Sequence, residues 1–290
     1  MKRKLSIILM SLIFLSGFGI MLYPVISNAY MEHQQKIIIN SYEKKVEKMP
    51  ENTKNEELER ASDYNKLLIG TAIVTDPFDP EAQKRLEESS DYFNILNLDE
   101  KGLMGYVVIP KIDVNLPIYH GTSEEVLQKG VGHLQNTSLP VGGESTHAVL
   151  SGHTGLSSAK LFTDLDKLEE GNIFYIKTLG ETFAYEVDQI KIVEPHETSD
   201  LLIESDKDYI TLVTCTPYGI NSHRLLVRGT RIPYTEEVEK EIKKEEKEKV
   251  GSTWRDEYFK ALAVGLGGLA ILGIIFIIVV LIKKKGRKKE

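Results

Sequence analysis

The hydrophobic pattern divides this chain into two apolar ends and a mixed centre. The runs Leu5–Ile26 and Leu262–Ile282 are nearly all apolar, and each is long enough to cross a hydrocarbon core of about 30 Å as a helix. In the centre, the pattern changes at Gly102 from scattered apolar positions to short apolar runs separated by turns. The pattern predicts a helical region followed by a β-rich domain, flanked by two transmembrane helices.

Charges at the two ends predict the orientation of these spans. Lys2-Arg3-Lys4 precedes the first span, and a basic cluster at 283–289 follows the second. The positive-inside rule places both ends in the cytoplasm and the centre outside. Ser27-Asn28-Ala29 could also serve as a signal-peptidase site. The first apolar run is longer than a signal core of about 7 to 15 residues, which favours a retained anchor, and the centre lies outside under either interpretation.

The region before the β-rich domain is predicted to be helical and to end in a turn-rich segment. Residues 30–68 have the pattern of one or two helices of modest amphipathicity, with a break marked by Pro50 and Asn52. The segment Thr75–Pro80 contains two prolines, which restrict the residues before them to extended conformations. This segment cannot be a helix interior or a central strand.

The region after Gly102 contains short runs of β-branched and aromatic residues. Residues 183–193 alternate apolar and polar positions, as expected for a strand with one buried face. With one clear helical insert at 159–168, the spacing predicts an all-β fold, a single barrel or sandwich of roughly 130 residues. The predicted strands are Leu103–Ile109, Val114–Tyr119, His147–Ser151, Asn172–Thr178, Thr182–Val193, Tyr209–Thr214 and Arg224–Arg231.

The charge distribution narrows the class of partner. The net charge is −7 and both ends are basic, so the centre is more acidic than the whole chain and nucleic acid is not an expected partner. Residues 235–250 are nearly all Glu and Lys, with opposite charges four residues apart, which predicts a solvated helix or stalk. No cluster of His, Cys or Asp has the spacing of metal ligands, so no metal or organic cofactor is expected.

The single cysteine, Cys215, is the first candidate for chemistry. A lone thiol outside the cytosol cannot form an intramolecular disulfide and is open to oxidation, so a role as a catalytic nucleophile explains its presence. The alternative is a small buried hydrophobe. Arg224 opens the next apolar run, after the turn-rich residues 217–222. If the two runs pair as a hairpin, Cys215 and Arg224 lie near each other at one rim of the sheet.

The partners of a catalytic thiol must favour the thiolate or stabilise an oxyanion. The guanidinium of Arg224 cannot act as a base at neutral pH, but its donors can stabilise an oxyanion; the alternative is a surface arginine at a strand end. Of the seven histidines, His153 ends an apolar run and begins a glycine-flanked loop, where a side chain can project toward a site. His133, His147 and His196 are interpreted as ordinary surface or packing residues.

These residues carry a resemblance to a known family. The segments Ser151–Gly155 and Thr211–Arg228 resemble the histidine and cysteine-arginine motifs of sortases, the Gram-positive cysteine transpeptidases. The similarity covers about 102–232 and implies a closed eight-stranded sortase β-barrel with Cys215, His153 and Arg224 as catalytic residues.

Further features resemble class C, the pilin-polymerising sortases. They are the two terminal spans, the Tyr218–Asn221 loop, the stretch 160–166, and Asp76-Pro77-Phe78 ahead of the barrel. The resemblance implies that residues 75–80 form a lid over the active site. A carboxylate from Asp76 could pair with Arg224, and the Phe78 ring could cover the thiol. Thr154 departs from the arginine that many class C members have at this place, which leaves the substrate groove less defined.

The resemblance also implies the substrates and the cellular location. The expected substrate is a pilin or surface protein with a C-terminal LPXTG-like sorting signal, cleaved between Thr and Gly through a thioester and transferred to a lysine of another pilin subunit. The expected location is the membrane of a Gram-positive bacterium, with the catalytic domain extracellular. Alternatives are a sortase that anchors proteins to peptidoglycan and a non-enzymatic membrane-anchored scaffold. The order and spacing of the histidine, cysteine and arginine argue against a papain-like protease.

The expected domain order follows from these interpretations. It is a signal or anchor at 1–29, a helical N-terminal region with the lid at 30–101, the catalytic barrel at 102–233, a charged stalk at 234–260, and a second span with a basic tail at 261–290.

Overall fold

The computed structural model describes residues 2–70, 74–81, 90–98, 100–156, 158–251, 255–256, 258–268, 271 and 274. The chain divides into two compact units, Met1–Val250 and Gly251–Glu290. The first unit contains the barrel, and the second contains helical residues at 258–268. Most of the predicted span 262–282 lies outside the described residues. Within the residues that are described, no helix is both long and apolar enough to cross a membrane.

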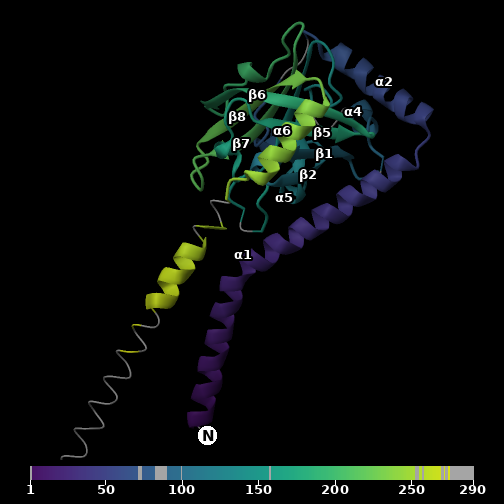
Figure 1. Ribbon diagram of the computed structural model, residues 1–290. Helices are drawn as coiled ribbons and strands as arrows, with labels where there is room; N and C mark the ends of the chain where they lie inside the picture. The colour runs from purple at the N-terminus through teal and green to yellow at the C-terminus, as the bar shows by residue number, and fades with distance from the viewer. Residues whose placement is uncertain are drawn as a thin grey trace, which may run out of the picture. The chain divides into compact units, whose positions relative to one another are not determined.

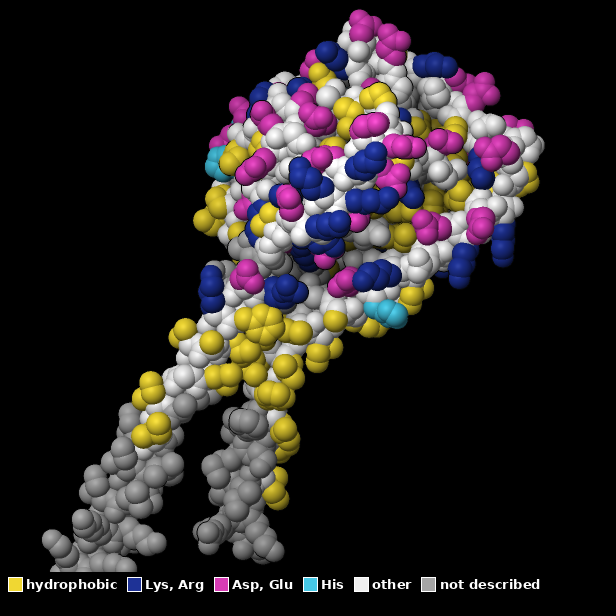
Figure 2. Space-filling model, viewed as in Figure 1, with side chains coloured by type: hydrophobic (Ala, Val, Ile, Leu, Met, Phe, Trp, Pro, Cys, Tyr) yellow, Lys and Arg dark blue, Asp and Glu magenta, His cyan; other side chains and the backbone are white. Residues whose placement is uncertain are grey.

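Two long helices precede the barrel (Figure 1). Helix α1 spans Lys2–Glu47 and includes Pro24, and helix α2 spans Glu51–Leu68 after Pro50. The predicted break at Pro50 is therefore confirmed, because this residue takes an extended conformation at the start of α2. Hydrophobic side chains such as Ile20 and Ile26 are exposed along the first half of α1, and Figure 2 shows such side chains on the helix where it extends beyond the barrel.

The two helices are fixed to the barrel by hydrogen bonds from buried side chains. The hydroxyl of Tyr42 on α1 donates to the Met104 carbonyl and accepts from the Leu179 amide, both at 2.9 Å. The Asn65 side chain on α2 bonds both backbone groups of Leu139 in the same way, at 2.7 and 3.1 Å. These bonds satisfy polar groups that burial would otherwise leave unpaired.

The described residues contain eight strands that close into one barrel, in the order β1-β2-β3-β4-β7-β8-β6-β5. The pairs β2–β3 and β4–β7 are parallel, and the others are antiparallel. Closure confirms the barrel alternative and removes free strand edges. The strands are β1 Leu103–Ile109, β2 Val114–His120, β3 Val131–His133, β4 Thr146–Ser151, β5 Ile173–Thr178, β6 Glu181–Val193, β7 Asp208–Thr216 and β8 His223–Ile232.

The barrel interior is filled by apolar side chains from every part of the sheet. Val107, Ile118, Leu150, Leu212 and Val227 are all fully enclosed within one continuous core. Burial at this level stabilises a barrel by roughly 25 cal/mol per Å² of apolar surface removed from water. The core fixes the strands, and so it fixes the loops at the rim where β4, β7 and β8 end.

Short helices connect the strands, and one differs from its prediction. The expected helical insert at 159–168 is instead a series of turns ending in the 3₁₀ helix η2, Leu165–Lys167. Leu161 has a φ of 41°, which an α-helix cannot contain. The buried carboxylate of Asp164 pairs with Lys160 and Lys167 and holds this compact form. The remaining short helices are α4 Ser90–Asn94, α5 Glu124–Lys129, η1 Pro110–Ile112 and η3 Ser199–Leu201.

The charged stretch after the barrel forms the predicted helix, α6, Glu236–Lys247, but one side of it is not solvated. Ile242 is buried against the barrel. Glu245 is also buried, and it accepts hydrogen bonds from the Asn172 side chain and the Ile173 amide. These contacts dock α6 beside β5, so this part of the chain belongs to the barrel surface rather than to a free spacer.

Candidate active site

The hairpin of β7 and β8 places Cys215 at the barrel rim. Cys215 lies directly opposite Arg224 in the antiparallel register of the two strands, as the hairpin prediction required. The thiol is free and partly buried. Burial raises the pKa of Cys215, the charge of Arg224 lowers it, and the charge of Asp76 raises it again, with a net upward direction. In this conformation the thiol form is favoured over the nucleophilic thiolate.

All three nitrogens of the Arg224 guanidinium donate hydrogen bonds. Nε and Nη2 bond the two carboxylate oxygens of Asp76 at 2.9 and 2.6 Å. Nη1 donates to the backbone carbonyls of Asn221 and His223 at 3.2 and 3.1 Å. The pairing of Asp76 with Arg224 that the sequence suggested is therefore present, and it is bidentate and largely buried. The carboxylate occupies donors that an oxyanion would otherwise use.

The ring of Phe78 lies near both the arginine and the histidine. It is 5.1 Å from the guanidinium carbon of Arg224 and 5.7 Å from the ring of His153. The Asp76 carboxylate also accepts a hydrogen bond from the Phe78 amide at 3.3 Å, which stabilises the turn around Pro77. The segment thus brings a carboxylate and an aromatic ring to the two predicted partners of Cys215.

His153 occupies the loop after β4, beside this segment. Its side chain is 20% exposed, and its Nε2 atom lies 3.5 Å from Oε2 of Glu124 on helix α5. Its backbone carbonyl accepts from the Phe162 amide at 3.1 Å, which holds the loop on the barrel. Sequence reasoning missed Glu124, because a glutamate in a short polar stretch carries no signal of its proximity to a histidine 29 positions later.

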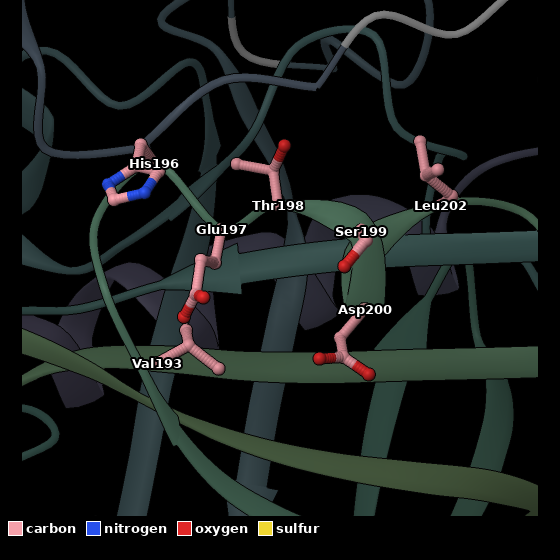
Figure 3. Close-up of a pocket in the computed structure, with 7 residues that line it drawn as sticks. All are labelled: Val193, His196, Glu197, Thr198, Ser199, Asp200 and Leu202. Atoms are coloured by element: carbon pink, nitrogen blue, oxygen red, sulfur yellow. The ribbon is translucent and has the colours of Figure 1, made fainter.

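A cavity of about 500 Å³ lies in the loop between β6 and β7, on the side of the Asp76 segment. Thr198 in its wall donates to the carbonyl of Val74 at 3.2 Å, and Val74 and Phe78 pack on the same apolar cluster as Leu201. This loop is a second contact for the segment, and the sequence did not single it out. Figure 3 shows the lining residues, which are Val193, His196, Glu197, Thr198, Ser199, Asp200 and Leu202.

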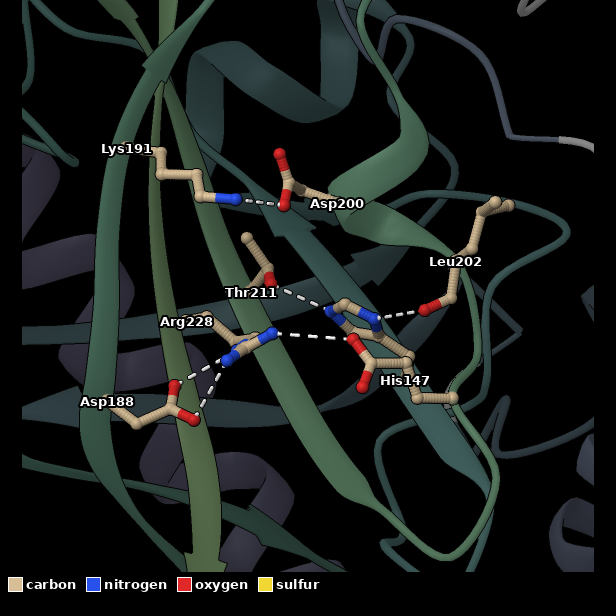
Figure 4. Close-up of polar contacts among 8 residues, drawn as sticks. His147, Asp188, Lys191, Asp200, Leu202, Thr211 and Arg228 are labelled. Carbon is tan, nitrogen blue, oxygen red and sulfur yellow. Dashed lines mark hydrogen bonds and ion pairs between the residues drawn. The ribbon is translucent and has the colours of Figure 1, made fainter.

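The loop is itself fastened to the outer wall of the barrel, as Figure 4 shows. Nδ1 of His147 donates to the Leu202 carbonyl at 2.8 Å, and its Nε2 accepts from Thr211 at 2.7 Å. Lys191 pairs with Asp200 at 2.5 Å. Burial lowers the pKa of His147 to about 4, so this ring is neutral and structural at physiological pH.

The other histidine cluster is also structural. His133 is fully buried, its Nε2 donates to the Ser138 carbonyl, and its Nδ1 accepts from the Tyr92 hydroxyl, both at 2.8 Å. Burial lowers its pKa to about 3. The interpretation of His133 and His147 as packing residues is consistent with these contacts, whereas His196 lines the cavity.

Metal ligands do not gather anywhere in the described part of the chain, where no three His, Cys, Asp or Glu residues are placed to hold an ion. The arrangement at the rim is instead that of a thiol with a cation and an imidazole nearby. Such a set supports nucleophilic attack on a carbonyl and stabilisation of the oxyanion that results.

Comparison with known proteins agrees with this chemistry. A model of the sortase domain matches residues 107–232. Sortase D of Bacillus subtilis is 34% identical over 131 residues, and Sortase A of Staphylococcus aureus is 32% identical over 125 residues. The matches cover 44% and 42% of this chain and 63% and 59% of those proteins. The chain therefore spans about three fifths of the curated relatives that it matches.

Solved structures match over a larger share. Sortase C1 of Streptococcus agalactiae has a TM-score of 0.62 at 49% identity, covering 69% of this chain and 96% of that one. Sortase C of Streptococcus pneumoniae has a TM-score of 0.62 at 46% identity, covering 68% and 97%. The chain belongs to the sortase family, a family of cysteine transpeptidases, and its structural neighbours support class C.

Proposed function

We propose that this protein is a transpeptidase that cleaves an LPXTG-like sorting signal between Thr and Gly and joins the acyl product to a lysine amine. The observation that carries the proposal is the direct cross-strand pair of Cys215 and Arg224 at the barrel rim. His153 lies at the same rim, close to the same Phe78 ring as Arg224. The three side chains supply a nucleophile, an oxyanion donor and a proton-transfer group.

The reaction begins with the attack of the Cys215 thiolate on the Thr carbonyl of the sorting signal. Arg224 stabilises the tetrahedral oxyanion, and the protonated His153 gives its proton to the leaving glycine amine as the Thr–Gly bond breaks. A thioester between Cys215 and the Thr carbonyl remains. The incoming lysine amine loses a proton to His153, attacks the thioester, forms an isopeptide bond and releases the thiolate.

The lid, residues 75–80, restrains this chemistry in the closed form. Asp76 occupies Nε and Nη2 of Arg224, and its charge contributes to the raised pKa of Cys215. Displacement of the lid therefore frees the donors for the oxyanion and removes one cause of the raised thiol pKa. A sorting signal that displaces the lid activates the thiol at the moment when the substrate is present.

The proposed setting is the surface of a Gram-positive membrane, with the protein anchored through the apolar runs at its ends. A sortase C solved from Streptococcus pneumoniae is described in terms of pilin substrate specificity, and the sequence features of class C support a pilin as the substrate here. Confinement of enzyme and substrate to one surface raises their effective concentration without any further contact.

Co-expression with candidate pilins tests this function. Wild-type protein is expected to give ladders of covalent pilin polymers that resist boiling in detergent, and Cys215→Ala is expected to give pilin monomers only. Replacing the acceptor lysines of the pilin by arginine separates the possible acceptors. Pilin monomers linked to cell-wall fragments in place of ladders would identify peptidoglycan anchoring, and unmodified pilin with wild-type enzyme would contradict the transpeptidase function for these substrates.

A further inference from the structure

One ring nitrogen at the proposed site is unusual. Nε2 of His153 is buried and makes no hydrogen bond to any residue that the structure describes. The buried rings of His133 and His147 differ, because each has a partner at both nitrogens. A buried polar atom without a partner costs free energy, so its presence at this site points to a role in another state of the site.

A carboxylate faces this nitrogen. Oε2 of Glu124 lies 3.5 Å from Nε2, a distance too long for a strong hydrogen bond but short enough for attraction to a protonated ring. The other oxygen, Oε1, accepts from the Gln128 side chain at 2.9 Å. The two oxygens thus have different neighbours, and Gln128 fixes the carboxylate with Oε2 turned toward the histidine.

The backbone under Glu124 is also fixed. Helix α5 begins after Ser123, whose hydroxyl accepts from the Val126 amide at 3.4 Å. The buried side chain of Leu127 anchors the helix to the barrel. Glu124 therefore stands on a capped turn with a defined position, although its side chain is 69% exposed.

We propose that Glu124 is a positioning residue for His153. Its carboxylate orients the imidazole through Nε2 and stabilises the imidazolium that donates the proton to the leaving amine. The inference rests on the function proposed above. Hydrogen bonds of this kind are often long in the resting enzyme and shorten in the transition state, so the 3.5 Å separation is compatible with this role.

The charges around His153 explain why a carboxylate is useful there. Arg224 lies beside the same Phe78 ring, and its charge is compensated by Asp76 only while the lid is closed. When the lid leaves, Arg224 keeps its positive charge and disfavours a second cation on His153. Glu124 approaches the ring from α5, opposes that repulsion in the open state, and keeps the histidine charged beside the Cys215 thiolate.

Steady-state transpeptidation with Glu124→Gln tests this role. Because Glu124 is mostly exposed, we expect kcat to fall by about twofold to fivefold, the range of exposed ion pairs, with KM for the sorting peptide unchanged. The alkaline limb of the rate–pH profile is expected to move to lower pH by about half a unit, since the imidazolium loses its stabilising charge. Glu124→Asp should restore part of both quantities.

Glu125→Gln is the matched control. Glu125 is the next residue of the same helix and pairs with Lys129 at 3.1 Å, so its loss removes the same charge without touching His153, and the pH profile should stay unchanged. A Glu124→Gln enzyme with wild-type kcat and pH profile would overturn the role of Glu124. If His153→Ala were inactive in the same assay, the proposed function would still stand. An active His153→Ala enzyme would instead remove the proposed site itself. Thermal melting of each variant confirms that it is folded.

Discussion

Two arginines four positions apart on β8 each pair with a carboxylate and lie near an aromatic ring, but these partners come from different parts of the chain. Arg228 forms a bidentate pair with Asp188 at 3.0 and 3.1 Å and lies 4.2 Å from the ring centre of Tyr209. Arg224 forms a bidentate pair with Asp76 and lies 5.1 Å from the ring centre of Phe78. The bidentate carboxylate and the aromatic ring beside Arg228 belong to strands β6 and β7, whereas those beside Arg224 belong to the segment before the barrel. Arg228 also pairs with Glu204 of the β6–β7 loop at 3.6 Å, and Arg224 also donates to two carbonyls of its own turn.

The difference between the two pairs is one of connectivity. Asp188 and Tyr209 cannot leave Arg228 without breaking the sheet, so that pair stabilises the fold. Asp76 and Phe78 can leave Arg224 while all eight strands stay paired, so that pair can be opened at a small part of the total free energy of unfolding. Under the proposed function, the same sequence feature, an arginine on a strand, is a structural group at position 228 and a catalytic group released by the lid at position 224.

Removal of Arg224 is expected to give the largest effect on activity. Arg224→Ala loses the oxyanion donor, so kcat/KM for a sorting peptide should fall by about 10²- to 10³-fold, with a small change in Tm. Arg224→Lys keeps the charge and loses the fork of donors, and it should recover only part of the rate. Wild-type turnover in Arg224→Ala would contradict the catalytic role of Arg224.

Removal of Arg228 is expected to change stability and spare the chemistry. Arg228→Ala leaves Asp188 without its partner, and we expect the free energy of unfolding to fall by about 1–3 kcal/mol. Denaturant unfolding measures this loss, and turnover at a temperature where both proteins are folded should remain close to wild type. If Arg228→Ala stopped turnover in the folded protein, Arg228 would also take part in the chemistry, and the purely structural role inferred for it would be wrong.

Acid is expected to destabilise the fold through two buried histidines, of which His147 lies near Arg228. The pKa of His147 is lowered to about 4 and that of His133 to about 3 by burial, so both are neutral in the folded state and protonate in the unfolded state near pH 6.5. Their contribution to stability is full above pH 6.5 and is lost as the pH falls, with a slope for each approaching about 1.4 kcal/mol per pH unit. Denaturant unfolding between pH 7 and 5.5 should show this loss, and His147→Gln should reduce the slope; a flat profile would contradict it.

Opening of the lid is expected to give a smaller effect, on thiol reactivity. Burial and Asp76 raise the pKa of Cys215, so Asp76→Ala should lower that pKa, and Phe78→Ala should expose the site. We expect alkylation of Cys215 at neutral pH to speed up by about threefold to tenfold in either variant. Asp188→Ala removes the equivalent carboxylate from Arg228 and is the matched control with an unchanged rate. Equal alkylation rates in wild type and in all three variants would contradict a lid function for residues 75–80.

The sequence could predict this fold because strand patterns and turns are local signals. The seven predicted strands match seven strands of the barrel within one or two residues. Strand β3 was missed because it is three residues long and contains Gly132, so it has neither the length nor the composition of a strand. Helix α5 was missed for a similar reason. The insert at 159–168 was wrong because Leu161 adopts a positive φ, and the preceding Lys160 bonds the distant carbonyl of Ile112, a contact that no local pattern signals.

The candidate site was predictable to a different extent for each residue. The proximity of Cys215 and Arg224 follows from a hairpin, which is local in sequence. The approach of Asp76 to Arg224 across 148 positions was reached only through a family resemblance, because charge alone does not select one carboxylate among many. Glu124 and the loop at 194–202 depend on how distant segments pack, and no pattern along the chain marks them.

The most direct test of the account is the intact mass of the protein after incubation with an LPXTG-type peptide. For wild type and for Asp76→Ala, we predict an adduct whose mass equals the peptide up to Thr, bound at Cys215, more abundant in the lid variant and released by hydroxylamine. Cys215→Ala should give no adduct. Absence of the adduct from both wild type and the lid variant, under conditions where each is folded, would contradict the assignment of Cys215 as the transpeptidase nucleophile.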